Sequence, residues 1–159
     1  MLDSPGSYRR IQVLIEKARH EPPPAFEVPE LMTDLIRWYN LNKEKMHPFE
    51  LAVLIHTKFV SIHPFVDGNG RVSRALMNFV LEKHGYPTLY FGLEERNTYL
   101  DAVAEGNEEN YQPIIDFMYD VYTKQHGPVL ADVWEQAPTD AFPDLMDLNE
   151  QFLALKERL

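Results

Sequence analysis

The chain has 159 residues, of which 45% are hydrophobic and 25% are charged, and its formal net charge is −10 at pH 7. This composition is typical of a folded, globular chain about the size of one domain, and no window is apolar enough to span a membrane. The excess of acidic residues argues against binding to the phosphate backbone of nucleic acids. The chain has no cysteine and no leader of the secretory type, which favours a cytoplasmic protein.

The N-terminal region predicts a short strand followed by a helix. An alternation of apolar residues indicates a strand with one buried face; these residues are Ile11, Val13 and Ile15. The prolines at 22–24 end this strand. Pro29 then suits the first turn of a helix, where the missing N–H costs nothing, and apolar residues follow it at helical spacing.

Two longer helices are predicted in the middle of the chain. Pro48 opens the first, whose apolar residues keep a 3.6-residue period as far as His63. The polar stretch 67–70 follows, and the second helix begins near Asn69 and stops at Gly85. Residues 90–93 are expected to form a connector or a short strand, followed by helices over 99–104 and 111–122.

Gly127 and Pro128 mark a break that divides the chain into a core, residues 1–126, and a C-terminal helical extension, residues 127–159. Apolar residues near the end of the extension keep helical spacing, and they either pack inward or pair with a second copy. The sequence therefore leaves open whether the chain forms a homodimer. Because only the N-terminal stretch is typical of a strand, we expect an all-α fold with one small β element.

The chemistry concentrates in the segment from His63 to Arg74, which lies between two apolar helices. Gly68 and Gly70 let the backbone approach a ligand closely. A helix that begins near Asn69 directs its free N–H groups and the positive end of its dipole at the same place, which suits a phosphate group.

Charged side chains of this segment complete the predicted phosphate site. Arg71 and Arg74 are three residues apart on one helix, so both guanidinium groups can bind phosphate oxygens on one side. Asp67 is suited to Mg²⁺, which prefers one carboxylate together with nucleotide phosphates. His63 can accept a proton from an incoming hydroxyl near neutral pH.

Each part has an ordinary structural explanation when it is taken alone. His63 could be a satisfied structural histidine, the two arginines a solvated helix face, and the two glycines a turn. Eight specified positions fall within twelve residues between two helices. This combination favours chemistry at phosphorus, where positioning and charge stabilisation do most of the work.

The segment resembles the signature of the Fic (filamentation induced by cAMP) family, His-x-Phe-x-Asp/Glu-Gly-Asn-Gly-Arg-x-x-Arg, and matches every specified position. The resemblance extends from about Gly6 to Tyr122. It implies a Fic-type helical bundle core with a short N-terminal β-hairpin, the flap, near residues 8–24. It also implies the activity of a protein adenylyltransferase (AMPylator), which transfers AMP from Mg-ATP to a Ser, Thr or Tyr hydroxyl of a target protein and releases pyrophosphate.

The resemblance implies a role for each matching residue. His63 is the catalytic base and Asp67 the Mg²⁺ ligand. The phosphate-binding residues are Gly68, Asn69, Gly70, Arg71 and Arg74. Adenine-binding residues are Tyr99 and Asn107, although a core tyrosine and a turn asparagine explain them equally well. The flap residues that dock the target by strand addition are Gln12, Val13, Leu14 and Ile15, the alternative being an ordinary strand over the core.

Many members of the family are inhibited by a helix with the pattern Ser/Thr-x-x-x-Glu-Gly/Asn. The two candidate pairs here, Glu105-Gly106 and Glu109-Asn110, are preceded at the required spacing by acidic residues, so neither fits. An inhibitory helix would then come from an upstream segment or from an antitoxin-like partner, as in the toxin–antitoxin pairs of the family.

Other classes of function agree less well with the sequence. A zinc enzyme would need a His-Glu-x-x-His helix or cysteine ligands, and a P-loop hydrolase would need its lysine. Within the family, the alternatives are another nucleotide donor or the removal of AMP, which depends on the inhibitory glutamate that the sequence lacks. Outside enzymes, the alternative is a nucleotide-sensing interaction module.

Overall fold

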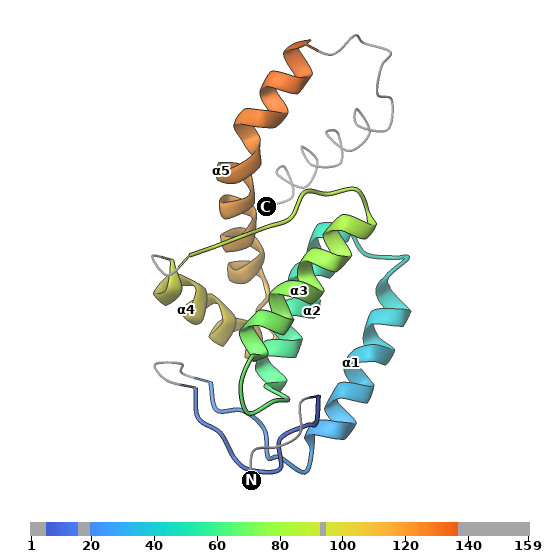
Figure 1. Cartoon of the computed structure of the whole chain (residues 1–159), viewed down its shortest axis with the longest axis vertical. Coiled ribbons are helices and arrows are strands. Elements are labelled where there is room, and N and C mark those ends of the chain that lie inside the picture. The colour runs from blue at the N-terminus through green and yellow to red at the C-terminus, as the bar shows by residue number, and fades with distance from the viewer. Residues whose placement is uncertain (1–5, 16–19, 93–94, 137–159) are drawn as a thin grey trace. The chain divides into compact units, whose positions relative to one another are not determined.

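A computed structural model describes residues 6–15, 20–92 and 95–136. The described part of the chain contains five helices (Figure 1): α1 (Val28–Asn42), α2 (Pro48–Ile62), α3 (Asn69–Lys83), α4 (Arg96–Asn107) and α5 (Gln112–Gln136). The chain divides into two compact units, Met1–Val121 and Tyr122–Leu159, and the first unit carries the predicted site.

Helix α2 is the central element of the first unit and contacts α1, α3 and α4 (Figure 1). Nine of its fifteen residues are buried, so it is apolar around most of its circumference, as befits a core helix. Pro48 stands at its first position, and the His47 side chain caps the helix by accepting a hydrogen bond from the N–H of Phe49 at 3.2 Å. Because α1, α3 and α4 all pack against α2, they hold its last turn in place.

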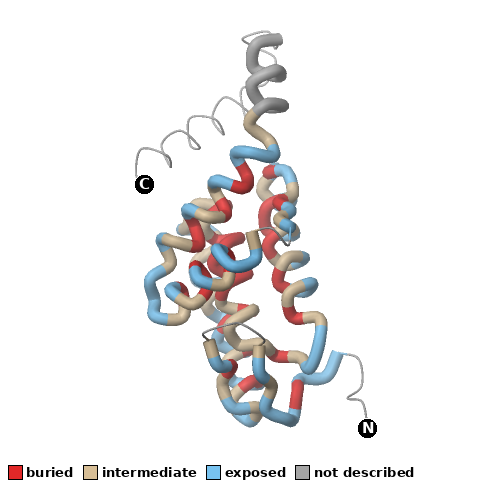
Figure 2. Tube along the Cα trace, turned by 90° about the vertical axis from the view of Figure 1, so that its left-hand side faces the viewer, coloured by how far each residue is buried: buried red, intermediate tan, exposed pale blue. Residues whose placement is uncertain are grey.

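The buried residues form a continuous core between the helices (Figure 2). The first turns of α5 join this core through aromatic rings. The Phe49 and Tyr119 rings are 6.2 Å apart and nearly perpendicular, and the Tyr99 and Phe117 rings are 6.1 Å apart. Such edge-to-face and tilted pairs stabilise a core beyond the area that they bury.

The predicted N-terminal β-hairpin is wrong, because the described residues ahead of α1 contain no strand. Prolines have no backbone N–H, so the three prolines at 22–24 cannot donate to a ladder. Two arms, residues 6–15 and 20–27, precede α1, and side chains join them instead. Gln12 Nε2 donates to the carbonyl of Pro22 at 2.8 Å, and Arg9 donates to the carbonyl of Pro23. The all-α prediction is confirmed for the described residues, without the flap hairpin.

The second half of the chain differs from the prediction in one respect. Helix α5 continues through Gly127 and Pro128 to Gln136, so the predicted break at these two residues is wrong. A proline inside a helix removes one backbone hydrogen bond and its ring crowds the carbonyl of the preceding turn, which often bends a helix but does not exclude helix on both sides of it. Residues 90–92 form a connector without a strand. The end of the predicted extension, with its apolar residues at helical spacing, lies outside the described residues. None of the helices that the structure describes is long and apolar enough to cross a membrane.

Candidate functional site

The loop between α2 and α3 is closed by the side chain of Asn69, which is only 2% exposed. Asn69 Oδ1 accepts a hydrogen bond from the N–H of Phe65 at 2.9 Å, and Nδ2 donates to the carbonyl of Phe65 at 2.8 Å. Since Phe65 is two residues beyond His63, these bonds fix the start of α3 beside the end of α2. The predicted phosphate ligand Asn69 therefore uses its side chain to shape the loop and leaves its backbone N–H for a ligand.

The start of α3 has the geometry of an anion site. Gly68 precedes the helix with φ 87°, a left-handed conformation that glycine adopts without strain. Its N–H donates to Asp67 Oδ1 at 2.6 Å. The N–H groups of the first helical turn have no acceptor within the helix, and the helix dipole places partial positive charge there.

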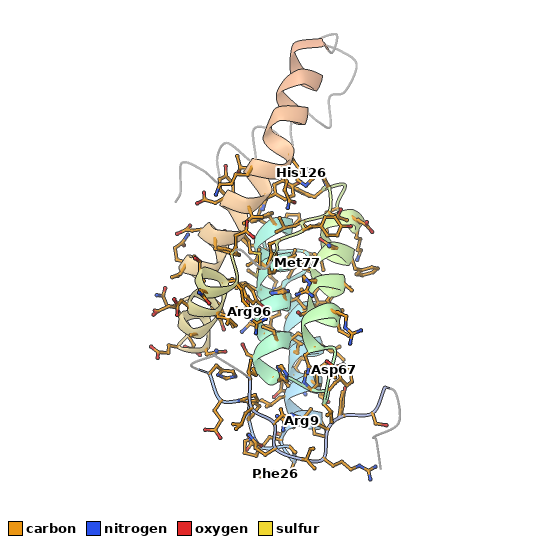
Figure 3. All side chains as sticks on the ribbon, turned by 60° about the vertical axis from the view of Figure 1, so that its left-hand side comes forward. Arg9, Phe26, Asp67, Met77, Arg96 and His126 are labelled. Carbon is orange, nitrogen blue, oxygen red and sulfur yellow. The ribbon has the colours of Figure 1, made fainter. Side chains whose placement is uncertain are left out.

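Both arginine side chains of the motif fold back over the glycines. A Cβ atom added to Gly68 would lie 3.4 Å from Arg71 Nη2, and one added to Gly70 would lie 3.3 Å from Arg74 Nη1. Helical side chains lean toward the N-terminus of their helix, which is why both guanidinium groups reach the loop. The structure thus gathers the two cations and the helix amides at one end of α3. Asp67 lies at this end, and Met77 lies farther along the helix (Figure 3).

The free amides of the first turn of α3 and the guanidinium groups of Arg71 and Arg74 together form an anion cradle. Asp67 lies beside this cradle and is exposed. Its Oδ2 is 3.0 Å from Arg71 Nη2, and the side chains of Asp67 and Arg71 are 90% and 75% exposed. In the described part of the chain, no group of three or more acidic or histidine side chains could hold a metal ion. A single exposed carboxylate instead fits Mg²⁺ that takes its other ligands from nucleotide phosphates and water.

Arg74 is supported by an aromatic side chain. Its Cζ lies 5.8 Å from the centre of the Phe91 ring, a cation–π contact. The described residues include no carboxylate that forms an ion pair with Arg74. Its charge is therefore available for a phosphate group.

His63 ends α2 in a left-handed conformation, with φ 52° and ψ 58°. This region costs roughly 1–3 kcal/mol for a residue other than glycine, and it persists only where the surroundings impose it. The Nδ1 atom of His63 lies 3.3 Å from the carbonyl oxygen of Val60. A carbonyl can only accept, so Nδ1 carries the proton of the neutral ring and the lone pair is on Nε2.

The surroundings of His63 favour its neutral form. Burial lowers the pKa of His63, the carbonyl of Val60 opposes this shift, and the charges of Arg9 and His20 add to it. The neutral imidazole is the form that can accept a proton. His63 is therefore suited to the role of general base at neutral pH.

Tyr99, which was predicted to bind adenine, lies in the core and is 9% exposed. Its hydroxyl oxygen is 3.0 Å from His56 Nε2, and its ring centre is 5.0 Å from that of Phe91. Burial raises the pKa of Tyr99 to about 12, so the phenol is uncharged. Phe91 in turn contacts Arg74, so Tyr99 supports this arginine indirectly, by packing against the Phe91 ring.

His56 is a residue of this region that the sequence reasoning missed. It is fully buried on α2, two helical turns before His63. Burial lowers the pKa of His56 to about 4, with an opposing effect of the Ser73 backbone and a further lowering by Arg74. The neutral ring links α2 to α4 through Tyr99. The only sequence signal was a histidine within an apolar helix.

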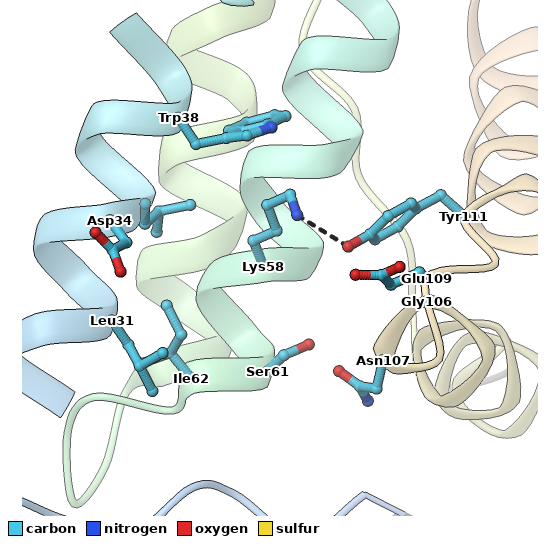
Figure 4. A pocket seen from close by; sticks show the side chains of 11 residues that line it. Leu31, Asp34, Trp38, Lys58, Ser61, Ile62, Gly106, Asn107, Glu109 and Tyr111 are labelled. Atoms are coloured by element: carbon cyan, nitrogen blue, oxygen red, sulfur yellow. Dashed lines mark hydrogen bonds between the residues drawn. The ribbon is translucent and has the colours of Figure 1, made fainter. Parts of the chain in front are cut away.

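Asn107, the other predicted adenine ligand, borders two hollows of the first unit. One, of about 330 Å³, lies between α1, α2 and the turn after α4, and Lys58 Nζ donates to the hydroxyl of Tyr111 in its wall at 2.9 Å (Figure 4). The other, of about 260 Å³, is lined by Asn107 and His20 among others. The Nδ2 atom of Asn107 is buried and has no hydrogen-bond partner among the described residues. Such donors are rare in folded proteins, which marks this amide as a candidate for ligand contact.

The residues predicted to dock the target lie in the extended arm before residue 16. The Leu14 side chain is 82% exposed, whereas Val13 and Ile15 are half-buried. The predicted buried face is wrong for Ile11, which is 58% exposed although it was expected to share that face with Val13 and Ile15, and the arm forms no ladder.

The comparison with known sequences agrees with this geometry. The sequence profile of the Fic/DOC family matches residues 1–81, which include His63 and the whole motif that follows it. The chain therefore belongs to the Fic/DOC family. Proteins named "Protein adenylyltransferase Fic" from Drosophila yakuba and Drosophila ananassae are 39% identical to it over 120 residues, which are 75% of this chain and 24% of each relative. The chain thus spans about a quarter of the length of these relatives.

Solved structures show the same fold. A Fic domain containing signaling protein from Bacteroides thetaiotaomicron superposes with a TM-score of 0.70 at 29% identity, covering 80% of this chain and 55% of that one. A fragment of Fic-1 from C. elegans gives a TM-score of 0.69 at 26% identity, covering 83% of this chain and 38% of that one.

Proposed function

We propose that this chain is the core of a protein adenylyltransferase that transfers AMP from Mg-ATP to a Ser, Thr or Tyr hydroxyl of a target protein. The observation that carries the proposal is the juxtaposition at the loop between α2 and α3. A neutral imidazole with its lone pair on Nε2 precedes an anion cradle with two arginines, and Asn69 holds the loop between them closed. The names of the Drosophila relatives support AMP as the transferred group.

ATP would bind with its phosphates at the N-terminus of α3. The free amides of the first turn and the guanidinium groups of Arg71 and Arg74 supply hydrogen bonds to phosphate oxygens. Asp67 would hold Mg²⁺, which when bound neutralises phosphate charge and orients the phosphate chain. The buried and unpartnered amide of Asn107 is proposed to donate to the adenine ring.

In the transfer step, His63 Nε2 takes the proton of the target hydroxyl. The hydroxyl oxygen forms a bond to the α-phosphorus, and the bond from this phosphorus to the oxygen bridging to the β-phosphate breaks. Pyrophosphate leaves with the bonding electrons, and Arg71 and Arg74 stabilise the charge that develops on it. The products are the AMP ester of the target and pyrophosphate.

The target would approach along residues Gln12–Ile15. The exposed Leu14 offers an apolar contact at the surface of this arm, and its extended backbone offers hydrogen bonds. Both belong to the N-terminal segment that lies against the end of α2, so a bound target would lie near the base.

Transfer of label from ATP to protein tests the proposal. ATP labelled at the α-phosphate should label proteins of a cell lysate, and ATP labelled at the γ-phosphate should not. His63→Ala should abolish the labelling, whereas the control His84→Ala, at the other end of α3, should leave it unchanged. Labelling from a different nucleotide would indicate another donor. Loss of AMP from modified protein would indicate the reverse reaction, and nucleotide binding without transfer would indicate a sensor.

A further inference from the structure

Four successive backbone carbonyls, two in the last turn of α2 and two just after it, accept hydrogen bonds from the N-terminal arms. The acceptors are Ser61, Ile62, His63 and Pro64. Arg9 donates its backbone N–H to the fourth at 2.8 Å, its Nε to the third at 2.8 Å, and its Nη2 to the second at 3.5 Å. His20 Nε2 lies 2.8 Å from the first. The carbonyls that a helix leaves unsatisfied at its C-terminus are thus satisfied from outside the helix.

Arg9 makes most of these bonds and is 1% exposed. Its Nη1 also donates to the carbonyl of Ile11 at 3.2 Å, and its Nη2 donates to the carbonyl of Pro23. The described residues place no carboxylate against its guanidinium group. A buried cation at the negative end of a helix dipole, bound only to carbonyls, is favourably placed and rigidly oriented.

We propose that Arg9 is a positioning residue that fixes the backbone of His63 and keeps the target-docking arm Gln12–Ile15 in register with this base. The inference rests on the proposed function, because it assigns Arg9 a task in that reaction. Arg9 also lies at the same end of the first unit as Asp67 (Figure 3).

The conformation of His63 explains why such a residue is needed. His63 has a positive φ and precedes Pro64, whose ring restricts the backbone before it further. Arg9 binds the carbonyls of two successive peptide groups, that of His63 through its side chain and that of Pro64 through its own N–H. These two bonds fix the direction in which the imidazole leaves the backbone.

The same guanidinium group also sets the position of the arms. Its bonds to Ile11 and Pro23 hold the backbone just before the docking residues and on the returning arm. The distance from a docked hydroxyl to Nε2 of His63 therefore depends on one side chain. A lysine keeps the charge but lacks the planar fork that reaches several carbonyls at once.

Kinetic variants separate this role from a general structural one. We compare Arg9→Lys and Arg9→Ala with the control Arg10→Ala, an exposed neighbour that loses the same charge. Arg9 contacts none of the groups of the phosphate cradle, so the Kd for ATP should stay within about twofold in all three. The kcat of transfer should fall about tenfold to a hundredfold in both Arg9 variants, the size of effect that a misplaced catalytic group produces, and should not change in the control.

Chemical rescue supplies a readout that a merely destabilised fold would not give. Millimolar guanidinium should restore part of the kcat of Arg9→Ala, and ammonium at the same ionic strength should not. If Arg9→Ala fails to fold, Arg9→Lys carries the kinetic comparison, with its melting temperature measured alongside. An unchanged kcat in a folded Arg9 variant, or a parallel loss of ATP binding and kcat, overturns the proposal.

An NMR titration of the histidines makes this test independent of the transfer assay. The His63 signal is assigned from its loss in His63→Ala. The groups that face His63 are Arg9, His20 and the carbonyl of Val60. Its pKa should rise in Arg9→Ala, where the cation is lost, and stay unchanged in Arg10→Ala. If the wild-type chain labels no protein but this shift occurs, the proposed function fails while the Arg9 contact is supported. If neither the chemical shift nor the pKa of the His63 ring changes in Arg9→Ala, the Arg9 proposal itself is overturned.

Discussion

Asp67 and Arg71, four residues apart at the start of α3, form an ion pair with 3.0 Å between Oδ2 and Nη2. Both side chains are largely exposed, so water screens their attraction and the pair contributes little to stability. The two residues are also the proposed ligands of Mg²⁺ and of phosphate. When the nucleotide binds, the ion pair can therefore break at a low cost in free energy, so that Asp67 binds Mg²⁺ and Arg71 binds phosphate.

We expect Asp67→Asn and Arg71→Ala to reduce transfer at least about tenfold while changing the free energy of unfolding by less than about 1 kcal/mol. Asp67→Asn should also raise the Mg²⁺ concentration needed for half-maximal rate. The matched control is the exposed pair Asp34 and Arg37 on α1. Asp34→Asn and Arg37→Ala should leave both the rate and the stability nearly unchanged. Full transfer activity in either site variant would contradict the assignment of the cradle.

The lowered pKa of His63 predicts the pH dependence of transfer. A base whose pKa is lowered stays unprotonated to lower pH, so the acid limb of kcat/KM should have its midpoint below the usual histidine value of about 6.5. Rates measured from pH 5 to pH 8 at constant ionic strength test this. A midpoint above 6.5 would mean that the imidazole is stabilised in its charged form.

The buried His56 predicts a pH-dependent stability. In the unfolded chain its pKa is near 6.5, and in the fold it is about 4, so the unfolded chain binds more protons between these values. Stability should therefore rise with pH from 4 to 6.5, with a contribution of the order of 3 kcal/mol. Urea unfolding of the wild type and of His56→Asn measures it as the difference between their pH slopes. Equal slopes would show that His56 does not titrate in this way.

The glycines of the loop allow strain and ligand contact to be separated. Gly68 and Gly85 both have positive φ, 87° and 80°, so Gly68→Ala and Gly85→Ala should each cost about 1 kcal/mol of stability. Gly70 is helical, and Gly70→Ala should not destabilise the fold. ATP affinity should fall in Gly68→Ala and Gly70→Ala, because the new methyl groups displace the arginines, and should not change in Gly85→Ala. Calorimetry of unfolding and of ATP binding distinguishes the three.

Asn107→Ala tests the proposed recognition of adenine. Losing a buried hydrogen bond to a ligand typically costs about 1–3 kcal/mol, so the affinity for ATP should fall about tenfold or more. The affinity for GTP should change less, because the lost contact is to the adenine ring. Asn110→Ala, which removes an exposed amide bound to Glu105, is the control. Equal losses for ATP and GTP would argue against recognition of the base.

The helices that carry the site were predictable because their signals are local. Pro48 and Asn69 mark the starts of α2 and α3, and both predicted starts are confirmed. The motif residues from Asp67 to Arg74 come together for the same reason, since a loop and one turn of helix are enough to bring glycines and arginines into contact. No long-range information is needed for such an arrangement.

The N-terminal arm and the support of the site could not be predicted in this way. Alternating apolar residues report which side chains are buried, but they do not show that the returning arm, with prolines at 22–24, has no N–H groups to donate. Arg9 and His56 bind partners 54 and 43 residues away, and only the fold reveals such pairs. Tyr99 illustrates the same limit, because an aromatic residue on a helix can face the core or a ligand with the same sequence pattern.

Arg9 and His63 belong to different parts of the fold, the N-terminal arm and the end of α2, and this affects how the protein loses activity on heating. The bonds that orient the imidazole come from an extended arm outside the helical core, and segments of this kind open before the core does. Detachment of the arm would leave the helices intact and the spectroscopic melting curve unchanged. Inactivation should therefore begin several degrees below global melting, and it should reverse on cooling because no core packing has been lost.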